Sequence, residues 1–388
     1  MRLAIDDDLL DGQVLRLVGS TVHQGADVQE VLDAARAVDP TNLDTWYAAF
    51  TDLAEVTVRQ ATDAESARRA FLRAANYHRA AGQMLIGAPL DPRLVAANTR
   101  SREAFGKALA LMPHGEVVSI AYGNTTLPGY FFAASDQPGP TVILTGGYDS
   151  SAEELFFWGA DSALARGYHV LAFDGPGQGA ALIQQGLVLR PDWENVIGPV
   201  IDFLLTRPEV DAQKIVLIGL SLGAHLAPRA ATAEHRLAAC VADCGTFDMF
   251  ATFLSRLPEQ MRAPFEAGDP AIHEQVGQML EQMAEPPSAG WPLRRGMLVH
   301  GADSPLDYIL KTKDYSLAGR AANITCPTFV CNAANDPIGA SAPDLVAALT
   351  CPHEFVTFTG AAADHCESGA RLQYDARMYQ WLGGVLRS

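Results

Sequence analysis

The segment 219–223 constrains this chain more than any other, because it reads Gly-Leu-Ser-Leu-Gly between an apolar run and an alanine-rich stretch. Residues 215–218 are Ile-Val-Leu-Ile, which is typical of a short buried strand, and residues 224–231 indicate the start of a helix. A G-x-S-x-G segment between a strand and a helix predicts a sharp turn with its serine, Ser221, exposed at the tip. The two glycines lack a Cβ, so the strand and the helix can approach closely around Ser221.

A serine nucleophile needs a histidine base and an acid that orients the histidine. After a turn of this kind the acid comes first along the chain and the histidine second. Asp336 follows the apolar run 328–331, and His365 follows the run 354–358. Because catalytic groups of open α/β sheets gather at the carboxyl ends of the strands, we expect Ser221, Asp336 and His365 to meet there. The predicted roles are nucleophile, orienting acid and general base, in that order.

Nucleophilic attack on a carbonyl creates an oxyanion, which needs backbone N–H donors. Leu222, directly after the serine, is one predicted donor. Tyr148 is the other, because it follows Gly146 and Gly147 at the end of the predicted strand 141–144.

Other titratable residues near these segments have competing interpretations. Asp336 could be a turn former, in which case Asp344 competes with it, although the position of Asp344 favours a helix N-cap. Glu153 and Glu154 are expected to complement the N-terminus of their helix, with an added acid in the cleft as the alternative. His225 lies one helical turn after the serine, which places it beneath the site.

The composition and the hydrophobic pattern of the sequence change near residue 115. Residues 1–115 are rich in Ala and Arg and predict a helical domain of four or five helices. Helical periodicity extends over residues 28–38, from Asn42 or Asp44 onward, over 63–85 and over 92–111. Over residues 116–388 strands alternate with helices, which predicts an α/β domain with a mostly parallel central sheet. Residues 247–311 look helical and interrupt this alternation, which indicates an insertion after the strand that follows Ser221.

The composition of the chain excludes some classes of binding partner. With 28 Lys and Arg against 45 Asp and Glu, the formal net charge is −17. A chain this acidic is not expected to bind nucleic acid or an anionic membrane, because like charges repel. No apolar run has the length of a transmembrane helix, and the acidic start does not read as a signal peptide. The six cysteines form no C-x-x-C pair and no metal spacing, which favours free thiols in a reducing cytoplasm. We therefore expect a cytoplasmic protein that takes a small-molecule substrate and uses no cofactor or metal.

The quoted segments, together with Phe-Asp-Gly-Pro-Gly-Gln-Gly at 173–179 and Gly-Gly-Tyr-Asp-Ser at 146–150, resemble the α/β-hydrolase fold. More narrowly, the chain resembles the branch with a helical N-terminal domain, which includes FrsA-like esterases, 2,6-dihydroxypseudooxynicotine hydrolase and fungal polyketide-shortening hydrolases. The resemblance covers nearly the whole chain. It implies that the N-terminal helices act as a lid over Ser221 and take part in a homodimer.

The resemblance also bears on the reaction. Some members of this branch cleave carbon–carbon bonds of β-diketone-like aromatic substrates with an extra acid from the lid region. Asp248, Glu259 and Glu266 lie in the insertion, and no motif marks one of them. The expected function is a serine hydrolase that cleaves an ester, or a carbon–carbon bond of a β-diketone-like or polyketide-type compound. The alternatives are an acyltransferase or cyclase with the same triad, or a plain carboxylesterase.

Overall fold

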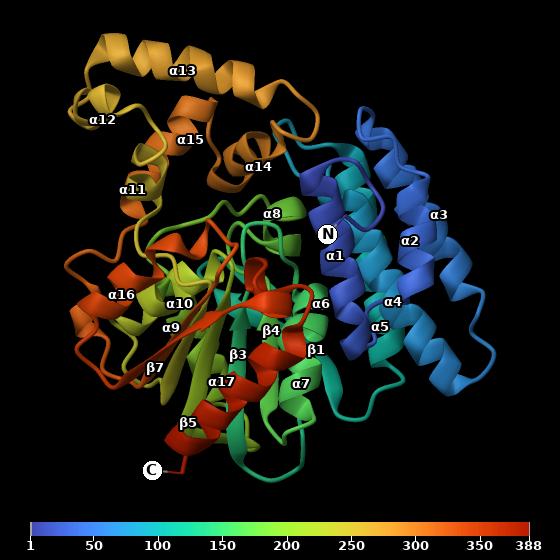
Figure 1. Cartoon of the computed structure of the whole chain (residues 1–388). Helices are drawn as coiled ribbons and strands as arrows, with labels where there is room; N and C mark the ends of the chain where they lie inside the picture. Colours follow the sequence, from blue (N-terminus) through green and yellow to red (C-terminus); the bar gives the residue numbers. More distant parts are fainter. Residues whose placement is uncertain (1, 388) are drawn as a thin grey trace.

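Eight strands form one sheet in the order β1-β2-β4-β3-β5-β6-β7-β8 in the computed structural model, which describes residues 2–387 (Figure 1). β2 runs antiparallel to β1 and β4, and every other neighbouring pair is parallel. This confirms the predicted mostly parallel sheet. The strands are β1 (Gly115–Tyr122), β2 (Thr125–Phe132), β3 (Gly139–Thr145), β4 (His169–Phe173), β5 (Val210–Leu220), β6 (Ala239–Asp243), β7 (Thr328–Ala333) and β8 (His353–Phe358).

The central strands are apolar because helices cover both faces of the sheet. Every residue of β4 and β6 is buried. β5 begins at Val210 rather than at the predicted Ile215. The extra residues, 210–214, mix apolar and polar side chains and none is buried, so they carry no apolar strand signal.

The helices of the α/β part are α6 (Ala152–Leu155), α7 (Asp161–Leu164), α8 (Gly179–Ile183), α9 (Glu194–Leu204), α10 (Gly223–Ala231), α16 (Ala342–Ala348) and α17 (Arg371–Val385). The single helix expected from Glu153 is split, because a π-helical turn over Phe156–Ala160 joins α6 to α7. Helix α8 had no counterpart among the predicted elements. The sequence favoured Asp344 as the N-cap of α16, and this prediction is wrong. The helix begins two residues earlier, at Ala342, after Ser341.

The N-terminal part is helical, as predicted, with α1 (Asp8–Gly19), α2 (Val28–Arg36), α3 (Leu43–Val58), α4 (Ala64–Gln83) and α5 (Pro92–Leu109). Each helix begins after a residue whose side chain accepts a hydrogen bond from a backbone N–H of the first turn: Asp7, Asp27, Asn42, Asp63 and Asp91. Such caps satisfy donors that have no partner inside the helix. Helix α1 is the one that no predicted range covered.

The N-terminal helices share a hydrophobic core with one face of the sheet. Phe105 of α5 is fully buried, and its ring lies 4.6 Å from that of Tyr130 on β2 and 5.6 Å from that of Phe156. Burial of one such side chain contributes about 1.5–3 kcal/mol. The shared apolar core therefore holds these helices beside the sheet, where Figure 1 shows them.

The predicted insertion forms a helical cap, α11–α15, above the end of the sheet (Figure 1). Its helices are α11 (Met249–Leu254), α12 (Glu259–Glu266), α13 (Pro270–Ala284), α14 (Trp291–His300) and α15 (Pro305–Lys311). The cap has a small core of its own around Phe265. Its two ends meet in an isolated bridge between Asp248 and Ser316, so the cap joins the sheet domain through a narrow neck.

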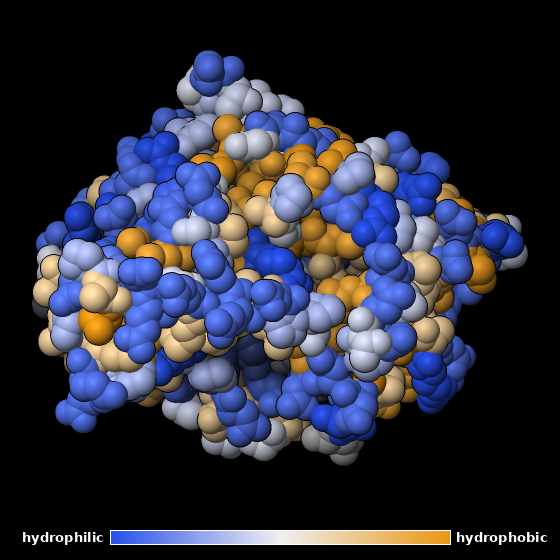
Figure 2. Space-filling view, turned by 90° about the horizontal axis from the view of Figure 1, so that it is seen from above, coloured by the Kyte–Doolittle hydropathy of each residue, from blue (hydrophilic) through white to orange (hydrophobic). Residues whose placement is uncertain are grey.

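The face that carries the cap is recessed. Seen from above, apolar side chains gather toward the middle of this face within a rim of hydrophilic ones, and the surface is hollowed there (Figure 2). No helix among residues 2–387 combines the length and apolarity that crossing a membrane requires.

Candidate active site

Ser221 lies at a strained turn between β5 and α10. Its φ is 59°, in the left-handed region that a non-glycine residue rarely adopts. The flanking glycines make this turn possible, because a Cβ on Gly219 would lie 1.9 Å from the carbonyl oxygen of Gly223, and one on Gly223 would lie 2.3 Å from that of Thr145. The backbone N–H of Ser221 donates to the carbonyl of Asp243 at 3.1 Å, which ties the turn to the end of β6. The predicted strand–turn–helix is thus present.

The other two residues of the predicted set lie beside Ser221. His365 Nε2 is 2.9 Å from Ser221 Oγ, and His365 Nδ1 is 2.7 Å from Asp336 Oδ2. Asp336 follows β7 and His365 follows β8, so the adjacent carboxyl ends of parallel strands bring together residues far apart in sequence. The second oxygen of Asp336 accepts the backbone N–H of Ile338 at 2.9 Å, which fixes the carboxylate in place.

The electrostatic surroundings of Asp336 and His365 favour an ionised aspartate and a basic histidine. Burial opposes ionisation of Asp336, but the hydrogen bond and charge of His365 outweigh it and lower the pKa of the carboxyl. Burial opposes the charged form of His365, but Cys366 and Asp336 outweigh it and raise the pKa of the imidazole well above its usual value. The hydrogen bond from Cys244 leads the causes that lower the pKa of the Cys366 thiol to about 7. A histidine in this setting is a strong proton acceptor from Ser221.

Two backbone N–H groups near Ser221 have no hydrogen-bond partner among the described residues, namely those of Tyr148 and Leu222. They are the two donors predicted from the sequence. Gly147 brings the loop against the serine, because a Cβ on Gly147 would lie 2.9 Å from Ser221 Oγ and 3.2 Å from the nitrogen of Leu222. The N–H of Gly147 donates instead to Ser150 Oγ at 3.1 Å.

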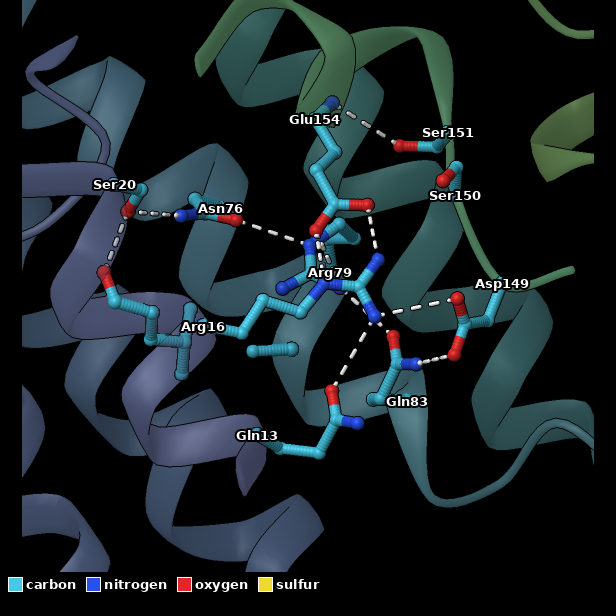
Figure 3. Close-up of polar contacts among 12 residues, drawn as sticks. Gln13, Arg16, Ser20, Asn76, Arg79, Gln83, Asp149, Ser150, Ser151 and Glu154 are labelled. Carbon is cyan, nitrogen blue, oxygen red and sulfur yellow. Dashed lines mark hydrogen bonds and ion pairs between the residues drawn. The ribbon is translucent and has the colours of Figure 1, made fainter. Parts of the chain in front are cut away.

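The loop that carries Tyr148, here called the glycine loop (residues 146–151), is anchored by a buried polar network (Figure 3). Asp149 Oδ1 lies 3.2 Å from Arg16 Nη1 of α1, and its Oδ2 accepts from Gln83 of α4 at 2.7 Å and from Arg295 of the cap at 3.1 Å. Burial opposes ionisation of Asp149, but the charges of Arg16 and Arg295 outweigh it and lower the pKa of its carboxyl. One carboxylate thus joins the N-terminal helices, the cap and the glycine loop.

Glu153 and Glu154 lie in the first turn of α6, as expected from the sequence, and the same network bears on the alternative of an added acid in the cleft. Glu154 accepts two hydrogen bonds from Arg16, at 2.7 and 2.5 Å, and lies 3.3 Å from Arg79 of α4. Its neighbour Glu153 accepts from the hydroxyl of Tyr130 at 2.6 Å. Both carboxylates are buried and engaged by these partners, so neither is an added acid in the cleft.

A cluster of aromatic and histidine side chains connects the glycine loop to the cap. The hydroxyl of Tyr148 lies 2.8 Å from His300 Nε2 and 3.3 Å from the hydroxyl of Tyr308. Burial lowers the pKa of His300 to about 3, so this histidine is neutral. The guanidinium of Arg295 stacks over the Tyr148 ring at 4.8 Å. Sequence reasoning missed His300, Arg295 and Arg16, and no local motif marks them.

The remaining candidates lie away from the serine oxygen. His225 is fully buried beneath the turn, as expected, and its Nδ1 lies 3.2 Å from the carbonyl of Thr246. In the cap, Asp248 caps α11, while Glu259 and Glu266 are exposed to solvent. None of these three carboxylates is hydrogen-bonded to Ser221, His365 or Asp336 within residues 2–387.

Comparisons with known proteins identify the family of this chain. Residues 142–372 match the model of the alpha/beta hydrolase family. The chain is 35% identical to the 20-hydroxy-prefusarin hydrolase of Gibberella moniliformis over 86% of this chain and 84% of that one. It is 32% identical to the hydrolase acrC of Aspergillus aculeatus, over 84% of this chain and 83% of that one.

Among solved structures, the crystal structure of 2,6-dihydroxy-pseudo-oxynicotine hydrolase superposes with a TM-score of 0.72 and 24% identity, covering 95% of each chain. This likeness covers the N-terminal helices as well as the sheet, and it confirms the predicted fold. With a family match over more than half of its length and hydrolase relatives above 30% identity, the chain belongs to the alpha/beta hydrolase family and is a hydrolase.

Proposed function

We propose that this hydrolase uses Ser221 as a nucleophile on a carbonyl carbon, with His365 as the general base and Asp336 as the acid that orients it. The observation that carries the proposal is the hydrogen-bonded row from Asp336 Oδ2 through the imidazole to Ser221 Oγ, with distances of 2.7 and 2.9 Å. A serine hydroxyl is a weak nucleophile until an adjacent base accepts its proton. The strained backbone of Ser221 supports the same role, because strain of this kind is concentrated at functional sites.

In the proposed reaction, His365 accepts the proton of the nucleophile and donates it to the leaving group. His365 Nε2 takes the proton of Ser221 Oγ as the bond to the carbonyl carbon forms, and later delivers it to the leaving group. Asp336 stays ionised and stabilises the imidazolium through Nδ1. The oxyanion accepts hydrogen bonds from the free N–H groups of Tyr148 and Leu222, and one such donor contributes about 10²–10³ in rate. Water then repeats the sequence on the acyl-enzyme.

The substrate we propose is a small or medium secondary metabolite with a carboxylic ester or lactone. Two observations support this class. Relatives that share most of the chain are named as hydrolases, one of them of 20-hydroxy-prefusarin. The side chains between the glycine loop and the cap include Tyr148 and Tyr308, whose hydroxyls and rings suit a partly apolar, oxygenated compound.

Carbon–carbon cleavage is the second candidate reaction, and the structure favours it less. None of the three candidate acids of the insertion is hydrogen-bonded to the triad in the described part of the chain, because Asp248 caps a helix and both Glu259 and Glu266 face solvent. Ester cleavage needs only the triad and the two N–H donors.

The test compares the wild type with Ser221→Ala on a panel of p-nitrophenyl esters, lactones and β-diketones. We expect ester or lactone turnover by the wild type, covalent labelling of Ser221 by a fluorophosphonate, and loss of both in the variant with unchanged circular dichroism. Full activity of Ser221→Ala would refute the proposal. Turnover of β-diketones with untouched esters would assign carbon–carbon cleavage instead.

The same enzyme could pass its acyl group to an alcohol or close a ring rather than admit water. Mass spectrometry of products formed in oxygen-18-labelled water separates these outcomes. Hydrolysis requires incorporation of the label, whereas acyl transfer or cyclisation leaves the product unlabelled.

A further inference from the structure

Two thiols from distant parts of the chain meet the imidazole of His365. Cys244 follows β6, and Cys366 follows His365 after β8. Their sulfur atoms are 3.4 Å apart, and Cys366 Sγ lies 3.7 Å from His365 Nε2. One ligand atom from each of the three residues lies within 4.8 Å of the other two. We propose that Cys244, Cys366 and His365 form a site for a thiophilic divalent cation, Zn²⁺ above all, which blocks the imidazole when it binds.

The spacing of the three atoms fits zinc. With Zn–S bonds of about 2.3 Å and Zn–N bonds of about 2.0 Å, tetrahedral geometry places two sulfur ligands about 3.8 Å apart and a sulfur and a nitrogen about 3.6 Å apart. The observed 3.4 and 3.7 Å differ from these values by a few tenths of an ångström. Rotation about the Cα–Cβ bonds of the cysteines supplies such a shift without movement of the backbone. Two thiolates and one imidazole are also a ligand set that zinc prefers.

The backbone holds both thiols toward the same point. Cys244 and Cys366 have φ values of 68° and 50°, a conformation that non-glycine residues seldom adopt. The N–H of Cys366 donates to Cys244 Sγ at 3.1 Å, the kind of second hydrogen bond that orients a metal ligand. The cysteines are 0% and 4% exposed, whereas the His365 side chain is 37% exposed, so a cation enters from the side of Ser221.

The ligand set has an open fourth position. Ser221 Oγ lies 2.9 Å from His365 Nε2, so the fourth ligand is the serine oxygen or a water beside it. Binding of Zn²⁺ displaces the protons of the two thiols, and the resulting site with two thiolates is electrically neutral. Because a metal on Nε2 occupies the lone pair that would accept the proton of Ser221, hydrolysis stops.

A second group of possible ligands lies nearby and does not bind a cation in this way. Asp243, Cys331 and Glu367 also come within 4.8 Å of one another. The guanidinium of Arg371 already pairs with the carboxylates of Asp243 and Glu367, so a second cation there would face this positive charge. Within residues 2–387, no arginine or lysine is hydrogen-bonded to the two sulfur atoms or to His365 Nε2.

The decisive measurement is metal binding rather than activity. The full-length protein is reduced, freed of metal with a chelator and titrated with ZnCl₂ by calorimetry, and with CoCl₂ by absorbance to detect thiolate-to-cobalt charge transfer. We expect one ion per chain. Cys244→Ser and Cys366→Ser should each weaken binding by at least about 100-fold, because loss of a group outside the ligand set already costs about 10–100-fold. Cys351→Ser is the matched control, since Cys351 is a buried cysteine hydrogen-bonded to Thr328.

The outcomes separate this site from the proposed function. Ser221→Ala should bind zinc with at most a small change, because the three protein ligands remain and water can take the fourth position in place of the serine oxygen; this result needs no catalytic role for His365. The inhibition does rest on the proposed function, and we expect ester hydrolysis and fluorophosphonate labelling by the wild type to fall with zinc occupancy and to return with chelator. Zinc binding that is undiminished in either cysteine variant, or no binding to the reduced wild type, would overturn the proposal. Thermal denaturation of each variant checks that it is folded.

Discussion

Replacement of Gly147 by alanine tests the proposed oxyanion site with one methyl group. The added Cβ would stand 2.7 Å from Ser221 Cβ, 2.9 Å from Ser221 Oγ and 3.2 Å from the nitrogen of Leu222. Carbon atoms that are not bonded to each other meet favourably at about 3.5–4.0 Å, so the serine or the glycine loop must move. The methyl group would also occupy space beside the two free N–H groups.

The expected loss of kcat in Gly147→Ala follows from the hydrogen bond that an oxyanion donor contributes. One oxyanion donor contributes about 10²–10³ in kcat, or about 2.7–4 kcal/mol of transition-state stabilisation. We expect Gly147→Ala to lose at least this much. If the serine also shifts from its 2.9 Å contact with His365, the loss will be larger. The effect should fall on kcat more than on KM, because the donors act on charge that develops only in the transition state.

The assay is hydrolysis of the best p-nitrophenyl ester, together with the rate of fluorophosphonate labelling and a thermal denaturation curve. Gly106→Ala is the matched control, because a Cβ at that position of α5 would meet nothing within 4 Å. It should leave kcat unchanged. A Gly147→Ala enzyme that keeps kcat within threefold of the wild type would refute the placement of the oxyanion beside Gly147.

Three further predictions address the surroundings of the site. Asp149→Asn should lower the free energy of unfolding in urea by about 2 kcal/mol, because it weakens charge-assisted hydrogen bonds to two half-buried arginines, Arg16 and Arg295; a change below 1 kcal/mol would contradict the anchoring role. Cys366→Ser removes the thiol that helps to raise the pKa of His365. Since the neutral imidazole is the active base, the acidic limb of the kcat/KM profile should move to lower pH, and an unmoved or higher limb would speak against this cause. Tyr148→Phe removes the hydroxyl that contacts His300 at 2.8 Å but keeps the backbone N–H. It should cost about 1 kcal/mol of stability and leave kcat within threefold, whereas a loss of 10²-fold would assign the catalytic role to the hydroxyl.

Much of the candidate active site could be predicted from the sequence, because each of its parts is a local pattern. Ser221, Asp336 and His365 each follow an apolar run that forms a strand of the parallel sheet, and parallel strands bring their carboxyl ends to one edge. The two glycines around Ser221 mark a close approach that no side chain allows. The helix starts predicted near residues 42, 63 and 92 are likewise local, and the structure confirms them, with Asn42, Asp63 and Asp91 as the capping residues.

Other features depend on how elements pack, and sequence patterns did not reveal them. The π-helical turn at Phe156–Ala160 breaks a predicted continuous helix where Phe156 packs against Phe105 of α5. The role of Glu154 is set by Arg16, 138 positions away in the chain. Such partners are specified by tertiary contact, and no spacing rule connects them.

The sequence by itself determined the arrangement on which the proposed chemistry at Ser221 rests, because a strand, a tight turn and two later strand ends suffice to bring Asp336 and His365 beside this serine. The tertiary structure alone decided what surrounds that chemistry. Asp149 gathers contacts from α1, α4 and the cap, and Cys244 meets Cys366 across 122 positions of sequence. The physical reason is that short-range patterns encode backbone geometry, whereas buried charges and thiols find their partners only when separate elements pack together.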